Sequence, residues 1–335
     1  MRYLVTGGAG FIGSHLADAL VAQGNVVTIL DDLSTGRREN IAHLDGSARF
    51  VRGTVLDAPL VDELVAESDV VVHLAAAVGV KLIVDRPLES FLTNIRGTEI
   101  ALAAAHRYGR KILITSTSEV YGKSQNGHPF REDDDRVLGS TQVSRWSYAT
   151  SKAADEILAF AYHRQRGLPT IVVRLFNCVG PRQTGAYGMV LPRLVQQALA
   201  GEPLTVHGDG LQTRCFCHVR DVVDALLRLL EGPRAVGEVF NVGATEEIPI
   251  LQLAERVRRA TGSLSVIRFV TYDEAYGQGY EDMRRRVPDI SKIRAAVGWR
   301  PRTSMDEIIA EVVASIRRAA PSPSLLHPLA VAWES

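Results

Sequence analysis

A glycine-rich turn between the first strand and the first helix is the strongest constraint on the fold of this chain. The apolar run Arg2–Thr6 predicts a strand, and Gly7-Gly8-Ala9-Gly10-Phe11-Ile12-Gly13 follows it directly and opens a helix. Glycines there let backbone N–H groups approach a diphosphate closely, and the helix N-terminus supplies partial positive charge. Glycines also serve tight turns for steric reasons alone, but this position favours a dinucleotide site. We predict cofactor contacts from Gly7, Gly10, Phe11, Ile12 and Gly13.

The end of the second predicted strand indicates which dinucleotide is bound. Val26–Asp31 reads as a strand, and Asp31 lies at the distance past the glycines where a carboxylate meets the ribose 2′-hydroxyl of adenosine. Asp31 would repel a phosphate at that position, so NAD is favoured over NADP, with Asp32 as a second contact. Arg37 and Arg38 lie close enough to leave NADP open, and the two aspartates could also form only a solvated turn.

Short apolar strands alternate with amphipathic helices over the first 170 residues, which predicts an α/β fold, a Rossmann-like doubly wound parallel sheet. The predicted strands are Arg2–Thr6, Val26–Asp31, Arg49–Arg52, Val70–Leu74, Lys111–Ser116 and Thr170–Leu175. The predicted helices are Ile12–Gln23, Leu60–Glu67, Phe91–His106 and Tyr148–Arg166.

A length of 335 residues predicts two lobes that share a cleft. After Arg174 the pattern becomes irregular, which predicts a smaller α/β lobe for substrate. We assign 1–175 to a Rossmann domain with a return at 216–242, where Asp221–Leu230 reads as a helix and Glu238–Val242 as a strand. Residues 176–215 and 243–315 form the smaller lobe, and 319–335 form a tail.

Composition narrows the partners and the compartment. Lys plus Arg and Asp plus Glu both number 38, so no overall field attracts nucleic acid or anionic lipid. No signal peptide or spanning run is visible, and we expect a cytoplasmic protein without a membrane partner. Cys178, Cys215 and Cys217 suit neither a disulfide framework nor a metal site, so we predict no metal and a buried pair at Cys215 and Cys217.

Tyr148-Ala149-Thr150-Ser151-Lys152 places a phenol and an ammonium on one face at the start of a helix. A nearby cation stabilises phenolate, so Lys152 should lower the pKa of Tyr148 from its usual value of about 10. Such a tyrosine can remove a hydroxyl proton while hydride passes to NAD. Alone the spacing is more often an exposed helix pair, but its place behind a dinucleotide turn favours catalysis.

Polar residues follow the fifth strand, whose carboxyl end should open beside the cofactor. Thr117, Ser118 and Glu119 suit a sugar hydroxyl or a proton transfer, although the hydroxyls could only cap the strand and Glu119 could be a surface carboxylate. Further on, Arg214 and the run Arg284–Arg286 suit a diphosphate or a carboxylate. Arg284 and Arg285 could equally be a solvated basic stretch.

Taken together, these residues resemble the extended short-chain dehydrogenase/reductases, the nucleotide-sugar epimerases, dehydratases and decarboxylases, over roughly residues 1–315. The resemblance implies NAD, a homodimer built through the helices Phe91–His106 and Tyr148–Arg166, and a nucleotide-sugar-binding smaller lobe. It also implies cofactor contacts at Leu74, Tyr148 and Lys152. The matching segments are Thr6–Gly13, Asp31, His73–Ala76, Tyr148–Lys152, Arg174–Arg182 and Gly208–Arg214.

Within this superfamily, the segment Ser116–Gly122 and the Arg286-Val287-Pro288-Asp289 run are most similar to UDP-glucuronic acid decarboxylases. The resemblance implies oxidation at C4, loss of carbon dioxide from C5, and UDP-4-keto-pentose or UDP-xylose as product. It implies Thr117, Ser118, Glu119, Tyr148, Lys152 and Arg286 as the catalytic set. It also implies UDP-sugar contacts at Asn177, Arg182, Arg214 and Arg286.

Departures from the family pattern keep rivals open. Many relatives carry an acidic residue for adenine where this chain has Thr54, and Asp57 is the nearest carboxylate. The stretches 75–81 and 145–147 differ from the best-known decarboxylases and leave a UDP-sugar 4-epimerase, acting on UDP-glucose or UDP-glucuronic acid, as the main alternative. A 4,6-dehydratase is disfavoured by Ser118, and a non-catalytic NAD-sensing protein is disfavoured by the intact Tyr148 and Lys152.

Overall fold

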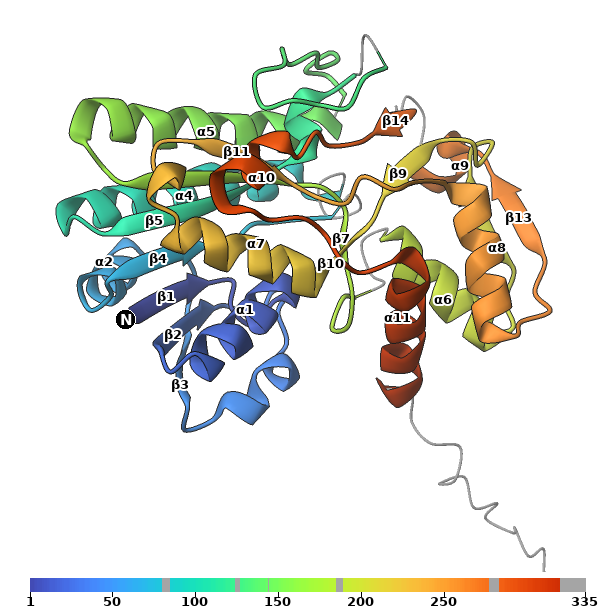
Figure 1. Ribbon diagram of the computed structural model, residues 1–335, viewed down its shortest axis with the longest axis horizontal. Helices are drawn as coiled ribbons and strands as arrows, with labels where there is room; N and C mark the ends of the chain where they lie inside the picture. The colour runs from blue at the N-terminus through green and yellow to red at the C-terminus, as the bar shows by residue number, and fades with distance from the viewer. Residues whose placement is uncertain (80–84, 124–126, 144, 185–188, 277–282, 320–335) are drawn as a thin grey trace, which may run out of the picture.

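The computed structural model describes residues 1–319 except for 80–84, 124–126, 144, 185–188 and 277–282 (Figure 1). Its largest element is a seven-stranded sheet in the order β3-β2-β1-β4-β5-β6-β11, in which every neighbouring pair is parallel. The predicted Rossmann-like fold is therefore confirmed. The strands are β1 (Arg2–Thr6), β2 (Val26–Asp31), β3 (Ala48–Arg52), β4 (Val70–His73), β5 (Lys111–Thr117), β6 (Thr170–Leu175) and β11 (Val239–Val242).

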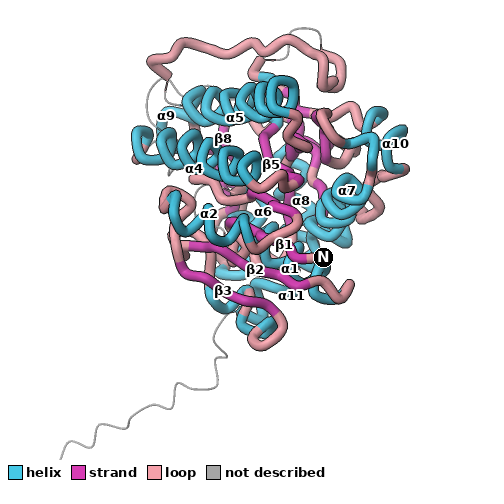
Figure 2. The backbone as a smooth tube through the Cα atoms, turned by 90° about the vertical axis from the view of Figure 1, so that its left-hand side faces the viewer, coloured by secondary structure: helices cyan, strands magenta, loops and turns pink. Residues whose placement is uncertain are grey.

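Helices cover both faces of this sheet (Figures 1 and 2). The central strands are buried on both sides, as β4 shows with four buried residues in succession, and this explains why they read as continuous apolar runs. One face packs against α1 (Phe11–Ala22) and α7 (Val219–Glu231). The other packs against α2 (Ala58–Ala66), α4 (Pro87–Arg107) and α5 (Arg145–Arg166), and α4 and α5 lie side by side.

The chain comes back to the large lobe twice. Helix α7 and strand β11 lie within the predicted return, and β11 extends the sheet beside β6. A later segment differs from the prediction, because α10 (Ser291–Val297) and Trp299 pack into the core of the large lobe although we assigned them to the smaller one. The indole N–H of Trp299 donates to the Asp221 carbonyl at 2.9 Å, which anchors this second return.

The smaller lobe has its own core of buried aliphatic side chains and Phe216. Apolar residues at helical spacing line the inward faces of its three longer helices. Residues beyond Ala319, the rest of the predicted tail, lie outside the described part of the chain. The lobe contains α6 (Val190–Ala200), β8 (Leu204–His207), α8 (Ile250–Thr261), β13 (Ile267–Val270), α9 (Tyr272–Tyr276) and α11 (Met305–Ala319).

Short strands connect the lobes and bring distant residues together. Strand β9 (Thr213–Cys215) lies between β12 (Glu247–Pro249) and β14 (Arg285–Arg286), and its pairing sets Arg286 opposite Arg214. Strand β7 (Cys178–Val179) pairs with β10 (Cys217–His218). Cys215 and Cys217 are buried and free as predicted, but they belong to two strands and not to one.

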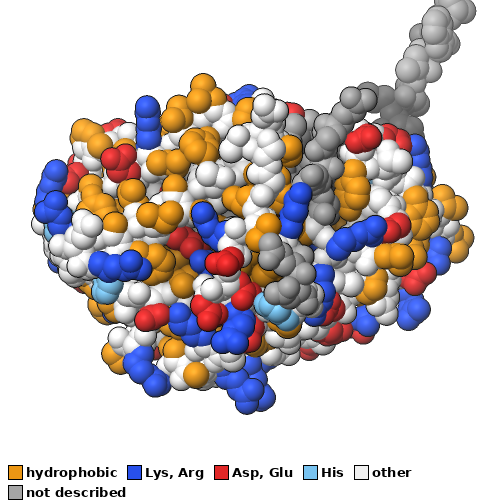
Figure 3. Space-filling model, turned by 90° about the horizontal axis from the view of Figure 1, so that it is seen from above, with side chains coloured by type: hydrophobic (Ala, Val, Ile, Leu, Met, Phe, Trp, Pro, Cys, Tyr) orange, Lys and Arg blue, Asp and Glu red, His pale blue; other side chains and the backbone are white. Residues whose placement is uncertain are grey.

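Four short 3₁₀ helices complete the secondary structure described, namely η1 (Arg38–Asn40), η2 (Ala42–Leu44), η3 (Ser118–Tyr121) and η5 (Pro233–Ala235). Among the described residues, no helix is both long and apolar enough to cross a bilayer. Acidic and basic side chains are interspersed over the face in Figure 3, as the balanced charge of the chain leads us to expect.

Candidate active site

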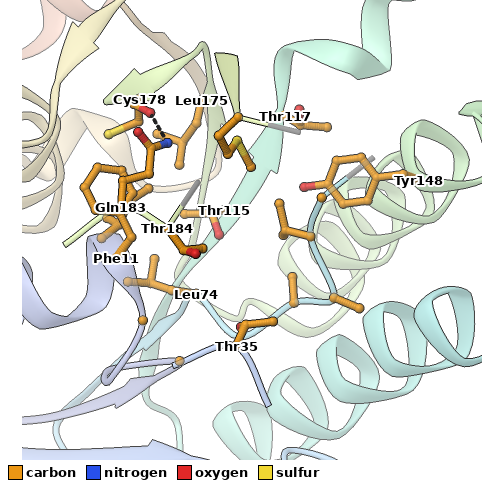
Figure 4. A pocket seen from close by; sticks show the side chains of 18 of the residues that line it. Phe11, Thr35, Leu74, Thr115, Thr117, Tyr148, Leu175, Cys178, Gln183 and Thr184 are labelled. Atoms are coloured by element: carbon orange, nitrogen blue, oxygen red, sulfur yellow. Dashed lines mark hydrogen bonds between the residues drawn. The ribbon is translucent and has the colours of Figure 1, made fainter. Parts of the chain in front are cut away.

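A cavity of about 850 Å³ lies at the carboxyl ends of the sheet strands and extends to the smaller lobe. It is lined at one end by the glycine turn and Asp31, and at the other by Arg214 and Tyr272. Ligands of doubly wound sheets bind at this edge. Figure 4 shows Phe11 and Gln183 on one side of the cavity and Tyr148 on the other, with the Tyr148 hydroxyl pointing inward.

The glycine turn is shaped by backbone contacts that a larger residue would break. Gly7 has a φ of +70°, and a Cβ there would lie 2.8 Å from the Ala75 nitrogen. A Cβ on Gly13 would lie 2.2 Å from the Gly7 carbonyl oxygen. Helix α1 begins at Phe11 with Gly10 as N-cap, no capping side chain and no acidic residue in its first turn, so its first N–H groups are open to an anion.

Asp31 is the last residue of β2, and its side chain lies against the glycine turn. Its carboxylate accepts hydrogen bonds from the backbone N–H of Ala9 at 2.9 Å and of Leu33 at 2.8 Å. Burial raises its pKa, and these hydrogen bonds act in the opposite direction. Asp32 also lines the cavity, as does Arg37, whereas Arg38 pairs with Asp45.

Asp57, the carboxylate nearest in sequence to the position where relatives hold adenine, does not line the cavity. Asp57 caps α2 by accepting from the Leu60 N–H, while Gly53 and Val55 line the cavity.

Tyr148 and Lys152 both line the cavity, one helical turn apart on α5. The expected lowering of the Tyr148 pKa is wrong for the protein by itself. Burial raises the pKa of Tyr148 well above its usual range, and the negative charges of Glu119 and Asp155 raise it further. Arg286 and a hydrogen bond with Thr117 lower the pKa, but by less. The ammonium of Lys152 donates to Asp155 at 2.7 Å, so a carboxylate that the sequence analysis did not consider offsets its charge.

Residues from three separate segments meet at the end of β5. Ser118 is buried and Thr117 caps η3, while an Nη of Arg286 donates to Glu119 at 3.1 Å. The other Nη of Arg286 donates to the Asn177 side-chain oxygen. Arg286 lines the cavity with about 12% of its side chain exposed, and its buried Nε has no hydrogen-bond partner among the described residues. The structure thus brings the predicted catalytic residues to one wall of the cavity.

The remaining predicted arginines divide between the cavity and the surface. Arg214 is buried and lines the cavity beside Arg286. Arg182, predicted as a UDP-sugar contact, also lines the cavity but pairs with Asp18 on α1 at 2.8 Å, which places it at the helix that follows the glycine turn. Arg284 and Arg285 pair with Asp209 and Glu247 and do not line the cavity, in agreement with the solvated alternative.

Sequence reasoning missed the contacts of four polar side chains next to this site, those of Asp155, His73, Thr6 and Thr98. Asp155 follows Lys152 by three residues on the same helix, and that spacing was a usable signal. His73 belongs to a segment we quoted for the resemblance without giving it a role, and it bonds Thr6 and Thr98. Neither threonine carries a sequence signal for such a contact. Of the stretch 75–81, residues 80 and 81 lie outside the described residues.

Comparisons with known proteins agree with this arrangement. The model of the NAD dependent epimerase/dehydratase family matches residues 3–243. The chain belongs to this family. A UDP-N-acetyl-alpha-D-glucosaminuronate decarboxylase of Bacillus cytotoxicus is 41% identical over 313 residues, which are 93% of this chain and 96% of the relative. UDP-glucuronic acid decarboxylase 1 of Arabidopsis thaliana is 36% identical over 319 residues, which are 95% and 70% of the two chains.

Solved epimerases of similar structure include two with bound nucleotide sugar. UDP-glucose 4-epimerase of Thermotoga maritima, solved with UDP-glucose, has a TM-score of 0.86 and 30% identity, covering 95% of this chain and 99% of that one. UDP-glucuronic acid 4-epimerase of Bacillus cereus, solved with UDP-glucuronic acid and NAD, has a TM-score of 0.86 and 29% identity, covering 96% and 100%.

The cavity residues of this epimerase/dehydratase family member fit the dinucleotide in the family's name. The backbone cradle at Gly7 and Gly13 leaves room that a Cβ would fill, and it faces the open N-terminus of α1. Asp31 offers a carboxylate rather than a cation at the position of the ribose, which suits NAD better than NADP. Within the described residues, no three His, Cys, Asp or Glu side chains gather as a metal site requires.

Proposed function

We propose that this protein is an NAD-dependent decarboxylase of UDP-glucuronic acid that oxidises C4 and removes the C5 carboxylate as carbon dioxide. The observation that carries the proposal is the guanidinium of Arg286, which lines the cavity, is held by Glu119 and Asn177, and has no partner for its Nε among the described residues. A largely buried cation in the cavity wall suits a substrate that carries a carboxylate. Curated relatives that act on UDP-linked uronic acids support this choice.

The cofactor would be held by the glycine turn, the N-terminus of α1 and Asp31. When bound, NAD would supply the acceptor for the C4 hydrogen with its electron pair, and its oxidised ring would carry a positive charge. Lys152 lies one turn along α5 and would bind the cofactor ribose with the protons that Asp155 leaves available.

Tyr148 acts as the base for the C4 hydroxyl. Its phenol points into the cavity, and Thr117 is within hydrogen-bonding reach of it (Figure 4). A phenol with a raised pKa is a strong base once ionised, but it needs positive charge nearby to ionise at neutral pH. Arg286 provides part of that charge.

Removal of the C4 hydroxyl proton and of the C4 hydrogen with its electron pair leaves a ketone β to the carboxylate. The bond from C5 to the carboxyl carbon can then break, and its electron pair forms the enolate. Arg286 orients the carboxylate, and Ser118 and Thr117 offer hydroxyl donors on the same wall. Glu119, which faces the cavity with a fifth of its side chain exposed, is placed to return a proton to C5 through water.

The test is to incubate the purified protein with UDP-glucuronic acid and NAD, and to follow carbon dioxide release and the sugar by mass spectrometry and NMR. UDP-xylose or UDP-4-keto-pentose with stoichiometric carbon dioxide supports the proposal. UDP-galacturonic acid without carbon dioxide would show a 4-epimerase, the function named for the solved structures. A matched incubation with UDP-N-acetylglucosaminuronic acid tests the substrate named for the Bacillus cytotoxicus relative.

We also propose that the protein works in the cytoplasm as a homodimer formed through α4 and α5. These helices pack side by side on the outer face of the sheet, and Ile157 on α5 and Leu88 on α4 are largely exposed. Light scattering of the purified protein measures the state directly. An Ile157→Asp variant should dissociate a dimer of this kind, whereas Leu264→Asp, at an exposed leucine of the other lobe, should not.

A further inference from the structure

A chain of buried polar side chains runs behind the cavity from Lys152 toward the glycine turn. The Lys152 ammonium donates to Asp155 at 2.7 Å, and their side chains are only 3% and 1% exposed. Thr98 on α4 also bonds Asp155. The Thr98 hydroxyl lies 3.3 Å from Nε2 of His73, whose Nδ1 lies 2.8 Å from the hydroxyl of Thr6.

The direction of every hydrogen bond in this chain follows from its acidic end. An ionised Asp155 can only accept, so Thr98 must donate its hydroxyl proton to it and accept from Nε2–H of His73. Nδ1 of His73 then carries no proton and accepts from Thr6, whose oxygen accepts the Ala75 N–H at 3.3 Å. Complete burial, followed by the charge of Lys152, lowers the pKa of His73 to about 3, so the ring stays neutral and in one tautomer.

This network gives Asp155 a role that the mechanism above does not use. We propose that Asp155 is a positioning residue of the reaction, which fixes the Lys152 ammonium beside Tyr148, is itself oriented through Thr98 and His73, and places a negative charge close to the Tyr148 phenol. The inference rests on the proposed function, because it takes Tyr148 as the base.

Two opposing effects of Asp155 follow from its position. It accepts one of the three protons of the buried Lys152 ammonium and leaves the others for the cavity. Its negative charge also raises the pKa of Tyr148, as does that of Glu119, while Arg286 lowers it. Asp155 therefore holds Lys152 in place at the cost of a less acidic phenol.

Glu156, a second charged group next to Asp155, already has its charge balanced by Arg174. Glu156 follows Asp155 on α5 and adds negative charge near it, but Arg174 pairs with Glu156 at 2.8 Å. Loss of the Asp155 charge should therefore act mainly on Tyr148, whose pKa this carboxylate raises.

The experiment compares Asp155→Asn with wild type as the NAD-bound enzyme. Asparagine keeps the shape and an acceptor but removes the charge, so the acid limb of kcat/KM should move to lower pH by about 1 unit. The plateau of kcat should fall about tenfold because the ammonium is less constrained. Asp62→Asn, at a carboxylate paired with Arg107 on the outer surface, is the matched control and should change neither quantity.

A second variant separates orientation from charge. Thr98→Val breaks the chain to His73 but leaves both charges, so it should lower kcat without moving the acid limb. An unmoved acid limb in a folded, NAD-binding Asp155→Asn protein overturns the proposal, and so does an unchanged kcat in Thr98→Val. If Asp155→Asn does not fold, the kcat of Thr98→Val decides.

A readout without turnover keeps this inference distinct from the proposed function. The ultraviolet absorbance of tyrosinate, taken as the difference between each protein and its Tyr148→Phe counterpart, reports the titration of Tyr148 alone. That titration should fall at lower pH in Asp155→Asn than in wild type. A wild-type protein that turns over no uronic acid would refute the proposed function, whereas an unshifted titration would refute the role of Asp155.

Discussion

The stability of the protein in mild acid should depend on His73. This side chain is fully buried between Thr6 and Thr98, and its pKa in the folded state is lowered from 6.5 to about 3. The unfolded chain binds a proton at this histidine below pH 6.5, whereas the folded chain does not until about pH 3. The contribution of the neutral ring is therefore complete above pH 6.5 and is lost as the pH falls toward 3.

The difference between 6.5 and about 3, at about 1.4 kcal/mol for each pKa unit, corresponds to at most about 5 kcal/mol of free energy of unfolding. The perturbation is His73→Asn, which keeps a neutral hydrogen-bonding group at every pH. Its absolute stability should be lower at neutral pH, because the bond to Thr98 is lost. Its deficit relative to wild type should then shrink by about 1.4 kcal/mol for each pH unit below 6.5.

Urea unfolding followed by circular dichroism, at a series of pH values from neutral down to about pH 4.5, measures this difference, and carboxylate titrations common to both proteins cancel. His43→Asn, at an exposed histidine paired with Asp18, controls for loss of a histidine as such. A deficit of His73→Asn that stays constant over this range would falsify the burial argument. It would mean that the folded protein binds a proton at His73 as readily as the unfolded chain does.

Three further predictions concern the cavity. Gly13→Ala should weaken NAD binding at least tenfold in calorimetric titration, because the new methyl group would lie 2.2 Å from the Gly7 carbonyl oxygen and force the turn apart. Asp31→Asn should weaken NAD binding and raise the relative affinity for NADP, and unchanged affinities for both would contradict its placement at the ribose. Arg286→Lys should lower kcat/KM for UDP-glucuronic acid about a hundredfold. The reason is that an ammonium cannot both bond Glu119 and hold a carboxylate through two parallel hydrogen bonds. Equal activity of the variant would show that the shape of the guanidinium is not used.

The strands of the large lobe were predictable because each is a local apolar run that ends at a turn. β1, β2 and β6 have the predicted bounds, because each buried apolar run is bounded in the sequence by polar or glycine residues. The second return to the large lobe was not predictable in this way. Nothing near Trp299 in the sequence indicates that its indole lies against Asp221, because that contact depends on how α7 is already placed.

The same distinction holds within the site. Tyr148 and Lys152 were found because both lie on one turn of one helix. The pKa of Tyr148 was wrong because it depends on burial and on Glu119, which approaches from another element. The position of Arg286 opposite Arg214 depends on the pairing of β9 with β14, which are separated by 69 residues in the sequence. Strands of two or three residues carry no periodicity that a sequence could reveal.

The pairing of Arg286 with Glu119 has a consequence for how a decarboxylase works. In the proposed reaction, negative charge leaves the substrate carboxylate and moves to the oxygen at C4 as the bond to C5 breaks. A cation that stabilised the carboxylate strongly would lower the ground state more than the transition state and would slow the step. Glu119 offsets much of the Arg286 charge at 3.1 Å, so the guanidinium can orient the carboxylate through its shape while contributing little net attraction. On this reasoning Glu119→Gln should tighten binding of UDP-glucuronic acid and lower kcat together, and a variant that lost affinity instead would show that Glu119 acts only through proton transfer.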